Sequence, residues 1–114
     1  MVFGDLKHAW WNGTSWNTQT VEFGAFDTLV GECCSLALDS HDNPHITYYE
    51  WKYVDRDTAY GNLKYASWTG TAWSIETVDT YTDMDSSLAL DSSDNPHITY
   101  VDYSDFYLKY ISLS

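Results

Sequence analysis

Basic residues are scarce in this chain of 114 residues. Five lysine and arginine residues stand against 17 aspartate and glutamate residues, which gives a formal net charge of -12. Such a surface repels phosphate backbones and anionic lipid headgroups, because either would need a cationic patch to dock on. We therefore expect no nucleic-acid partner and no membrane partner.

Long apolar runs are also missing, and so is the basic start followed by an apolar stretch that marks a signal peptide. Cysteine is limited to the adjacent pair Cys33 and Cys34. Neighbouring cysteines suit neither a disulfide across the fold nor a metal site, so we expect a small buried residue beside a free thiol. Aromatic residues, in contrast, make up 18% of the chain and provide ample material for a core.

The chain contains an internal repeat. SLALDSHDNPHITY (35–48) returns as SLALDSSDNPHITY (87–100) with one change, from His41 to Ser93. LKHAWWNGTSW (6–16) returns as LKYASWTGTAW (63–73), and a partial third copy, LKYIS, begins at Leu108. Repeats of this length are typical of propellers and solenoids.

Each repeated segment is predicted to be a short strand, because β-branched and aromatic residues alternate and turn residues separate the segments. If Gly70 and Thr71 are the central residues of a tight hairpin, Trp68 faces Trp73. The same register in the first copy pairs Trp11 with Trp16. Such pairs contribute about 0.2 to 1 kcal/mol to sheet pairing, which favours a structural role for four of the six tryptophans.

The residues LKYASWTGTAWSIETVD, SSLALDSSDNPHITYVD and the further LKY resemble tandem β-propeller repeats of the NHL or BNR kind. Such repeats are found in predicted secreted or surface proteins of bacteria and archaea. The resemblance covers residues 6–110 and implies an extracellular or cell-surface location and an all-β fold of propeller blades, without pointing to an activity. In the order of an NHL-type blade, SLALD is the innermost strand a, PHITY is b, LKYA is c and the tryptophan strand is d.

In that order the whole chain, 1–114, is one propeller segment with two four-stranded blade equivalents plus one extra strand. Strands c and d lie over 6–22, a complete blade over 35–79, and strands a, b and c over 87–112. Propellers use roughly four to eight blades, so we expect other subunits to complete the fold.

Completion is expected to be head to tail, with the N-terminal d strand of one copy finishing the last blade of its neighbour. Three copies give six blades and four give eight. A heterologous contact of this kind closes into a ring or continues as a filament. Strand c occurs three times, so the copy at Leu6 or at Leu108 is surplus to a closed ring. A fragment of a longer array and an open fibre therefore stay open as alternatives.

Two connections differ in length between the copies. VEFGAFDTLVGECC and YYEWKYVDRDTAYGN both occupy connections that leave a blade at the same end, and both are expected to be loops. Loops on a rigid scaffold often bind ligands, although a solvated loop that differs by drift is an equal alternative. The candidate binding residues are Glu50, Trp51, Tyr53, Asp55, Arg56, Asp57 and Tyr60, with Asp102, Tyr103, Asp105 and Tyr107 as their shorter counterpart.

Two histidines, His45 and His97, recur at the start of strand b. Recurrence favours packing or a turn hydrogen bond, since a catalytic site needs only one copy. His41 is not repeated, and on a tight turn it lacks enough further ligands for a metal site. The acidic stretch with Asp79, Asp83 and Asp85 lacks the glycine and terminal glutamate of an EF-hand loop. We expect no metal and no cofactor.

Three functional hypotheses follow. The first is a non-enzymatic β-propeller module that recognises a glycan or a protein on its loop-rich face. The second is a structural protein that self-assembles into a ring or filament by completing blades between subunits. The third is a fragment of a sialidase-like glycoside hydrolase, which depends on fold analogy and would need an arginine cluster where this chain has only Arg56.

Overall fold

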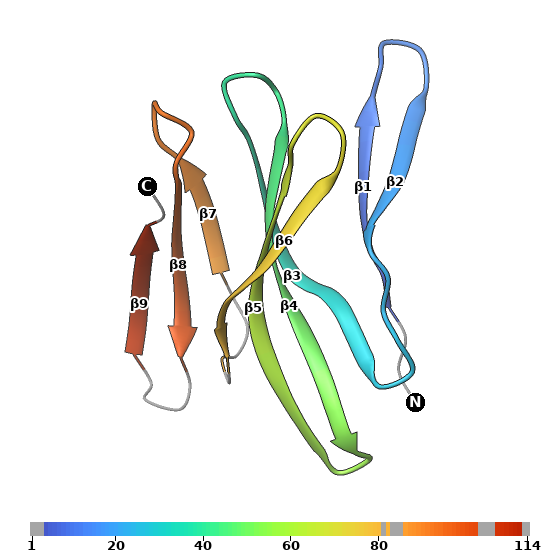
Figure 1. The fold of residues 1–114 in the computed structure, drawn as a ribbon, viewed down its shortest axis with the longest axis vertical. Helices are drawn as coiled ribbons and strands as arrows, with labels where there is room; N and C mark the ends of the chain where they lie inside the picture. The colour runs from blue at the N-terminus through green and yellow to red at the C-terminus, as the bar shows by residue number, and fades with distance from the viewer. Residues whose placement is uncertain (1–3, 81, 83–85, 103–106, 113–114) are drawn as a thin grey trace.

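A computed structural model of the protein describes residues 4–80, 82, 86–102 and 107–112. Within these residues the chain forms β-strands and no helix, which confirms the expected all-β fold (Figure 1). The strands are β1 (Leu6–Trp11), β2 (Trp16–Glu22), β3 (Thr28–Leu38), β4 (Pro44–Asp55), β5 (Thr58–Trp68), β6 (Trp73–Thr80), β7 (Ser86–Leu90), β8 (Pro96–Asp102) and β9 (Tyr107–Ser112).

The strands form three antiparallel sheets, and each strand pairs with its neighbour in sequence. The first sheet has β1 and β2, the second has β3 to β6, and the third has β7 to β9. Figure 1 shows the four-stranded sheet standing between the other two. These sheets span 6–22, 28–80 and 86–112, so the middle one begins seven residues before the expected strand at Ser35.

The predicted tryptophan pairs are confirmed. Trp11 is the register partner of Trp16, and Trp68 is the partner of Trp73. The rings of both pairs meet edge to face, with centroids 5.7 Å and 5.5 Å apart. Gly70 has a φ of +106°, a backbone conformation that glycine adopts without the steric penalty of a Cβ atom. The turn chemistry and the aromatic pair therefore fix the same register.

The sheets are stacked face to face, with a core layer in each of the two gaps. We call the face of a sheet that carries Ile46 and Tyr48, or their equivalents Ile98 and Tyr100, its front face, and the opposite face its back face. In the first gap, the back face of the first sheet meets the front face of the second. The residues of this layer are Leu6, Val21, Val30, Ile46, Tyr48 and Ala66.

The second gap follows the same rule, because the back face of the second sheet meets the front face of the third. The residues of this layer are Tyr49, Leu63, Tyr65, Leu88, Ile98 and Tyr100. A hydrogen bond recurs as well. Tyr48 Oη donates to Glu22 across the first gap at 2.6 Å, and Tyr100 Oη donates to Asp79 across the second at 2.8 Å. Each sheet is thus packed on the previous one in the same way.

Strand β3 contains an irregularity near its middle, where the pairing with β4 shifts between Glu32 and Ser35. Cys33 lies there with a φ of +52°, and both Cys33 and Cys34 are exposed free thiols. The expectation of a buried residue at this pair is therefore wrong. Within the described residues β4 is the only strand that pairs with β3, apart from isolated bridges between Gly4 and Leu29 and between Ala25 and Thr28, so the bulge lies at a sheet edge and leaves both side chains exposed.

Candidate functional site

The connection from β4 to β5 is a long hairpin rather than the loop that the sequence predicts. Strand β4 continues to Asp55 and β5 starts at Thr58, which leaves a turn of Arg56 and Asp57. The backbone N–H of Asp57 donates to the carboxylate of Asp55 at 2.8 Å, a local bond that favours tight turns. The extra residues alternate aromatic and polar side chains, so they extend two strands. Figure 1 shows the tip projecting beyond the sheets at the end opposite the short turns.

The hairpin side chains divide into an exposed tip and a partly packed stem. Asp55, Arg56 and Asp57 are exposed, and Trp51, Tyr53 and Tyr60 are half-buried. The indole N–H of Trp51 donates to the carboxylate of Glu32 at 3.1 Å. The structure therefore brings six of the seven candidates of this segment onto one projecting hairpin.

Glu50, the seventh candidate, is buried and does not face a ligand at the surface. Its carboxylate accepts hydrogen bonds from Asn62 Nδ2 at 3.0 Å and from Lys64 Nζ at 3.3 Å. Lys64 also pairs with Glu22 at 3.0 Å, and Tyr48 donates to that same carboxylate. Burial raises the pKa of Tyr48, and the neighbouring Glu22 raises it further. Glu50 thus belongs to a polar network that joins the first sheet to the second.

The shorter counterpart of the hairpin is only partly described. Asp102 ends β8, is buried, and pairs with Lys109 of β9 at 2.8 Å. Tyr107 begins β9 and is exposed. Tyr103 and Asp105 lie outside the described residues. Asp102 occupies the position equivalent to Glu50, and its pairing with a lysine is equivalent too.

Both recurring histidines form a hydrogen-bond relay at the base of a turn. His45 Nε2 donates to the carboxylate of Asp39 at 2.9 Å, and Tyr65 Oη donates to Nδ1 of the same ring at 2.5 Å. Burial raises the pKa of Tyr65. The equivalent contacts join Asp91, His97 and Tyr110. Of the two roles expected for these histidines, packing or a turn hydrogen bond, the structure shows the hydrogen bond.

The aspartates of the two relays have low pKa values. Burial raises the pKa of Asp39, but the hydrogen bond from His45 and those from the backbone N–H groups of Asn43 and His41 outweigh it and lower the pKa to about 2. The same kinds of bond, led by the one from His97, lower the pKa of Asp91 to about 2. Both carboxylates are therefore structural acceptors at neutral pH.

The turns at the tops of the second and third sheets touch each other. Ser40 donates to the Asp94 carboxylate through its backbone N–H at 2.9 Å and through its hydroxyl at 2.5 Å. This contact brings Asp39, His41 and Asp94 together, with one ligand atom of each within 4.8 Å of the others. Both carboxylates already accept hydrogen bonds, from His45 and from Ser40. The cluster is explained as a contact between turns.

The acidic stretch after β6 is described only in part. Asp79 accepts the hydroxyl proton of Tyr100 in a hydrogen bond. Asp83 and Asp85 lie outside the described residues.

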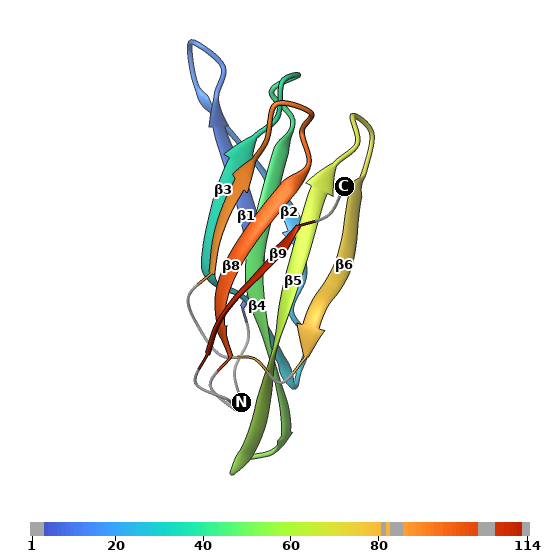
Figure 2. The same ribbon diagram turned by 90° about the vertical axis from the view of Figure 1, so that its left-hand side faces the viewer.

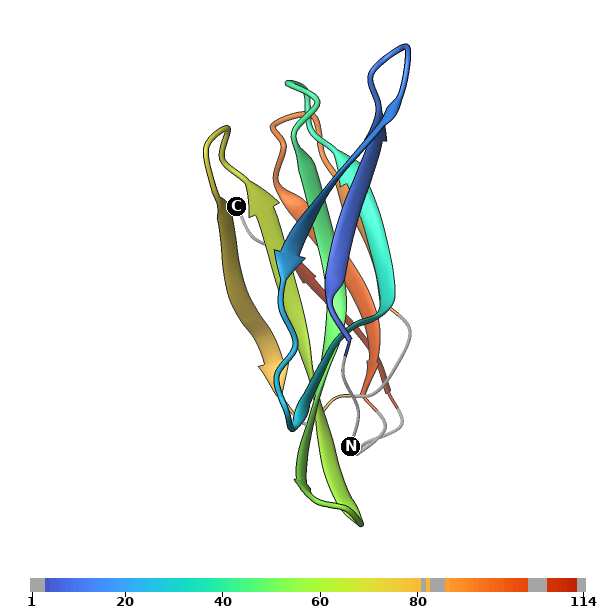
Figure 3. The same cartoon turned by 90° about the vertical axis from the view of Figure 1, so that its right-hand side faces the viewer.

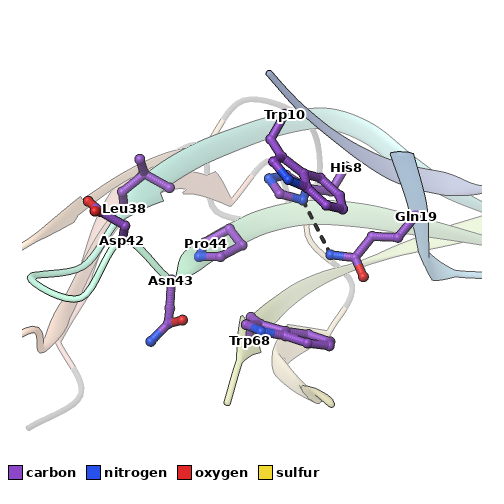
Figure 4. A pocket seen from close by; sticks show the side chains of 8 residues that line it. All are labelled: His8, Trp10, Gln19, Leu38, Asp42, Asn43, Pro44 and Trp68. Atoms are coloured by element: carbon purple, nitrogen blue, oxygen red, sulfur yellow. Dashed lines mark hydrogen bonds between the residues drawn. The ribbon is translucent and has the colours of Figure 1, made fainter. Parts of the chain in front are cut away.

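A cavity of about 370 Å³ opens between the first sheet and the turn that joins β3 to β4 (Figure 4). The Trp10 ring stacks on His8, with centroids 5.2 Å apart, and His8 Nδ1 lies 3.4 Å from the amide nitrogen of Gln19. Burial lowers the pKa of His8. Figure 4 shows Trp68 on the other side of the cavity. The remaining lining residues are Leu38, Asp42, Asn43 and Pro44.

Sequence reasoning missed this cavity, although a signal was present. The first LK segment carries His8 and Trp10 where the second carries Tyr65 and Ser67. These are two of the four positions at which the two eleven-residue segments differ.

No protein-family model, curated protein or solved structure matches the chain. Within its described residues, no helix is long and apolar enough to cross a membrane. The internal repeat allows equivalent residues in successive sheets to be compared with each other. A covered residue shows what its uncovered equivalent lacks.

Two apolar positions are uncovered, one on the front of the second sheet and one on the back of the third. Leu36, on the front of β3, is 54% exposed, whereas its equivalent Leu88 is 8% exposed. Leu108, on the back of the third sheet, is 74% exposed, whereas its equivalent Leu63 is fully buried. The same residue types are thus buried where a neighbouring sheet covers them and exposed where none does.

Figures 1, 2 and 3 show why. In Figure 1 the β1–β2 hairpin diverges from the four-stranded sheet toward its turn, and in Figure 3 it crosses β3 at an angle. In Figure 2 the third sheet leaves β6 uncovered. The first sheet has no equivalents of β3 and β4, and the described part of the third sheet has no equivalent of β6. Each end of the stack is short of the strands that the other end possesses.

Proposed function

We propose that this protein is a self-assembling structural module, a segment of a β-propeller that further copies complete. One observation supports this above all. The exposed surfaces around Leu36, on the second sheet, and Leu108, on the third, carry the same residues that are buried between the chain's own sheets. A surface whose partner is already present elsewhere in the same chain is complementary to another copy of that chain.

The joint between copies is heterologous, because it brings the C-terminal sheet of one chain to the N-terminal sheet of the next. Such a joint closes into a ring when its rotation allows, and otherwise continues as a filament. Each chain supplies strands for two blades, so three or four copies fall within the range of roughly four to eight blades that propellers use. Unpaired strand edges add backbone hydrogen bonds to the joint.

The test is the mass of the protein in solution. Light scattering coupled to size exclusion, over a concentration range of roughly 1 to 100 μM, is expected to show a trimer, a tetramer or larger species. Negative-stain electron microscopy then separates rings from filaments. A monomer throughout the range would refute the proposal.

A second function, non-enzymatic recognition of a glycan or protein, is favoured by the projecting β4–β5 hairpin. Its stem holds Trp51, Tyr53 and Tyr60 next to the exposed Arg56, a mixture that is enriched at recognition surfaces. Binding to a glycan array is expected to fall with Trp51→Ala. Trp10→Ala, in the cavity at the other end of the sheets, is the matched control. Equal binding by both variants and the parent would exclude the hairpin as the site.

A further inference from the structure

The contact between neighbouring turns shows how the top of one sheet meets the top of the next. The N–H and hydroxyl of Ser40 in the second sheet both donate to Asp94 in the third. Ser92 is the equivalent of Ser40, and Asp42 is the equivalent of Asp94. Each turn therefore carries a serine for the turn that follows it and an aspartate for the turn that precedes it.

Within the described part of the chain, two of these equivalent residues, Asp42 and Ser92, make no such contact between turns. Asp42 would accept from a turn on the first sheet, but that sheet has only β1 and β2. Among the described residues no side-chain hydrogen bond reaches the Asp42 carboxylate, which is exposed and lines the cavity beside Leu38. Asp42 also has a φ of +64°, matching the +66° of Asp94, so its backbone is already in the conformation of the paired turn. Ser92, at the other end of the stack, is exposed.

The apolar surface beside Asp42 also lacks the neighbour that covers its equivalent in the third sheet. Leu36 and Leu38 are more than half exposed, while Leu88 is covered by the second sheet. The residues that cover the third sheet from the second include Ala37 and Thr47, and their equivalents Ala89 and Thr99 are exposed. A β7–β8 hairpin from another molecule thus presents the residue types that fit over Leu36 and Leu38.

The strand pairing completes the fit. In the second sheet β4 pairs with β5 so that Tyr48 faces Lys64. In the third sheet β8 pairs with β9 so that Tyr100 faces Lys109, and Lys109 pairs with Asp102. Leu6 and Lys7 of β1 are the equivalents of Leu63 and Lys64 in β5 and of Leu108 and Lys109 in β9. Strand β1 can therefore pair with a β8 strand as β5 pairs with β4. Within the described residues β1 pairs only with β2, which leaves its other edge available.

We propose that the β7–β8 hairpin of a second copy docks on the exposed part of β3 beside the open edge of β1. There Ser92 of the second copy donates to Asp42, and β1 replaces the second copy's own β9 as the partner of β8. Lys7, which is exposed and has no ion-pair partner among the described residues, then pairs with Asp102 of the second copy. This identifies the surplus strand as β9, and it rests on the proposed self-assembly.

The choice of β9 follows from what each strand buries. Leu6 of β1 is buried against the second sheet, whereas Leu108 at the equivalent place in β9 is largely exposed. Only Ile111 of β9 packs against the core layer of the second gap. Strand β9 is therefore the easier of the two to displace.

Disulfide trapping tests the docking directly. In a background with Cys33→Ser and Cys34→Ser, one batch carries Ser92→Cys and the other Asp42→Cys, and the two are mixed under mild oxidation. We expect a cross-linked dimer at about ten times the yield of either batch alone. The matched control is one chain with both Ser40→Cys and Asp94→Cys, which is expected to cross-link within the monomer and shows that the geometry permits a bond.

The outcomes separate this inference from the proposed function. A parent protein that is monomeric by light scattering refutes both. A parent that assembles while the mixture cross-links no better than its separate components, in the presence of a working control, refutes the docking alone. A cross-linked dimer in the mixture at the expected yield supports it.

Removing residues 107–114 tests the replacement of β9. If β1 takes its place, the shortened chain assembles at least as tightly as the parent, with a dissociation constant that is equal or lower. If β9 itself is the third strand of the completed blade, the shortened chain loses assembly by tenfold or more. Circular dichroism at low concentration checks that the shortened chain remains folded.

Discussion

Replacing Lys64 by methionine is expected to destabilise the protein strongly. The Lys64 ammonium group is buried and holds two carboxylates, Glu22 at 3.0 Å and Glu50 at 3.3 Å. Methionine fills a similar volume but leaves both carboxylates without their cation. Breaking a buried ion pair by removing one partner costs about 3 to 5 kcal/mol, and we expect a loss of free energy of unfolding in that range.

The internal repeat provides a matched control in Lys109, which sits at the equivalent place in β9. Its side chain is 39% exposed and pairs with the Asp102 carboxylate at 2.8 Å. Because water reaches the Lys109 ammonium group, whereas that of Lys64 is buried between two carboxylates, Lys109→Met is expected to cost less than Lys64→Met.

The assay is urea unfolding followed by tryptophan fluorescence, at one fixed protein concentration because assembly contributes to apparent stability. With a slope of about 2 kcal/mol per molar urea, a loss of about 4 kcal/mol lowers the midpoint by about 2 M. Adding Glu22→Gln to Lys64→Met is expected to recover part of this loss, since one unpaired carboxylate is removed. Equal effects of Lys64→Met and Lys109→Met would refute the assignment of Lys64 as a buried tether between sheets.

Three further outcomes are expected. The pKa of Asp39 is about 2 in the folded protein, against an ordinary value of 3.8 for a solvated aspartate. Its hydrogen bond with His45 therefore stabilises the fold above about pH 4. Stability is expected to fall as the pH drops from 4 to 2, and Asp39→Asn to flatten that fall in pH-dependent melting curves. Trp68→Leu removes the edge-to-face contact with Trp73 and is expected to cost about 0.5 to 1.5 kcal/mol in urea unfolding. Gly70→Ala meets no atom within 4 Å, so its expected cost of about 1 to 2 kcal/mol comes from the positive φ alone, and a melting temperature equal to the parent's would contradict this.

The sequence predicted the features that local chemistry decides. Glycine in the tight turns and the facing tryptophans set the hairpin register, which the pairing of Trp68 with Trp73 confirms. The recurrence of His45 after proline favoured packing or a turn hydrogen bond over catalysis, and the structure shows a hydrogen bond to Asp39 at the turn. The two inserted segments were also predicted to lie at one end, and the β4–β5 hairpin does lie opposite the short turns.

The errors come from contacts between residues far apart in the chain. Glu50 was assigned to a ligand surface because it lies in an insertion rich in aromatic and charged residues. Its burial depends on Lys64, which is 14 residues away, and on the first sheet, which brings in Glu22 from 42 residues before Lys64. The cavity beside Trp10 was missed for a similar reason. It exists because the first sheet, which has no equivalents of β3 and β4, covers only part of the second sheet. No single segment of the sequence reveals this arrangement.

The negative charge of the chain opposes assembly, whereas burial of the exposed leucines favours it. Each copy carries a formal charge of -12, so copies repel one another over the screening length, which is about 30 Å at 10 mM salt and about 8 Å at 150 mM. A joint made mainly of apolar faces around Leu36 and Leu38 loses little when salt is added, while the repulsion weakens. We therefore expect light scattering to show larger species at 300 mM sodium chloride than at 10 mM. If added salt instead dissolved the assembly, ion pairs such as that proposed for Lys7 would have to dominate the joint, and burial of the two leucines would not be its main source of stability.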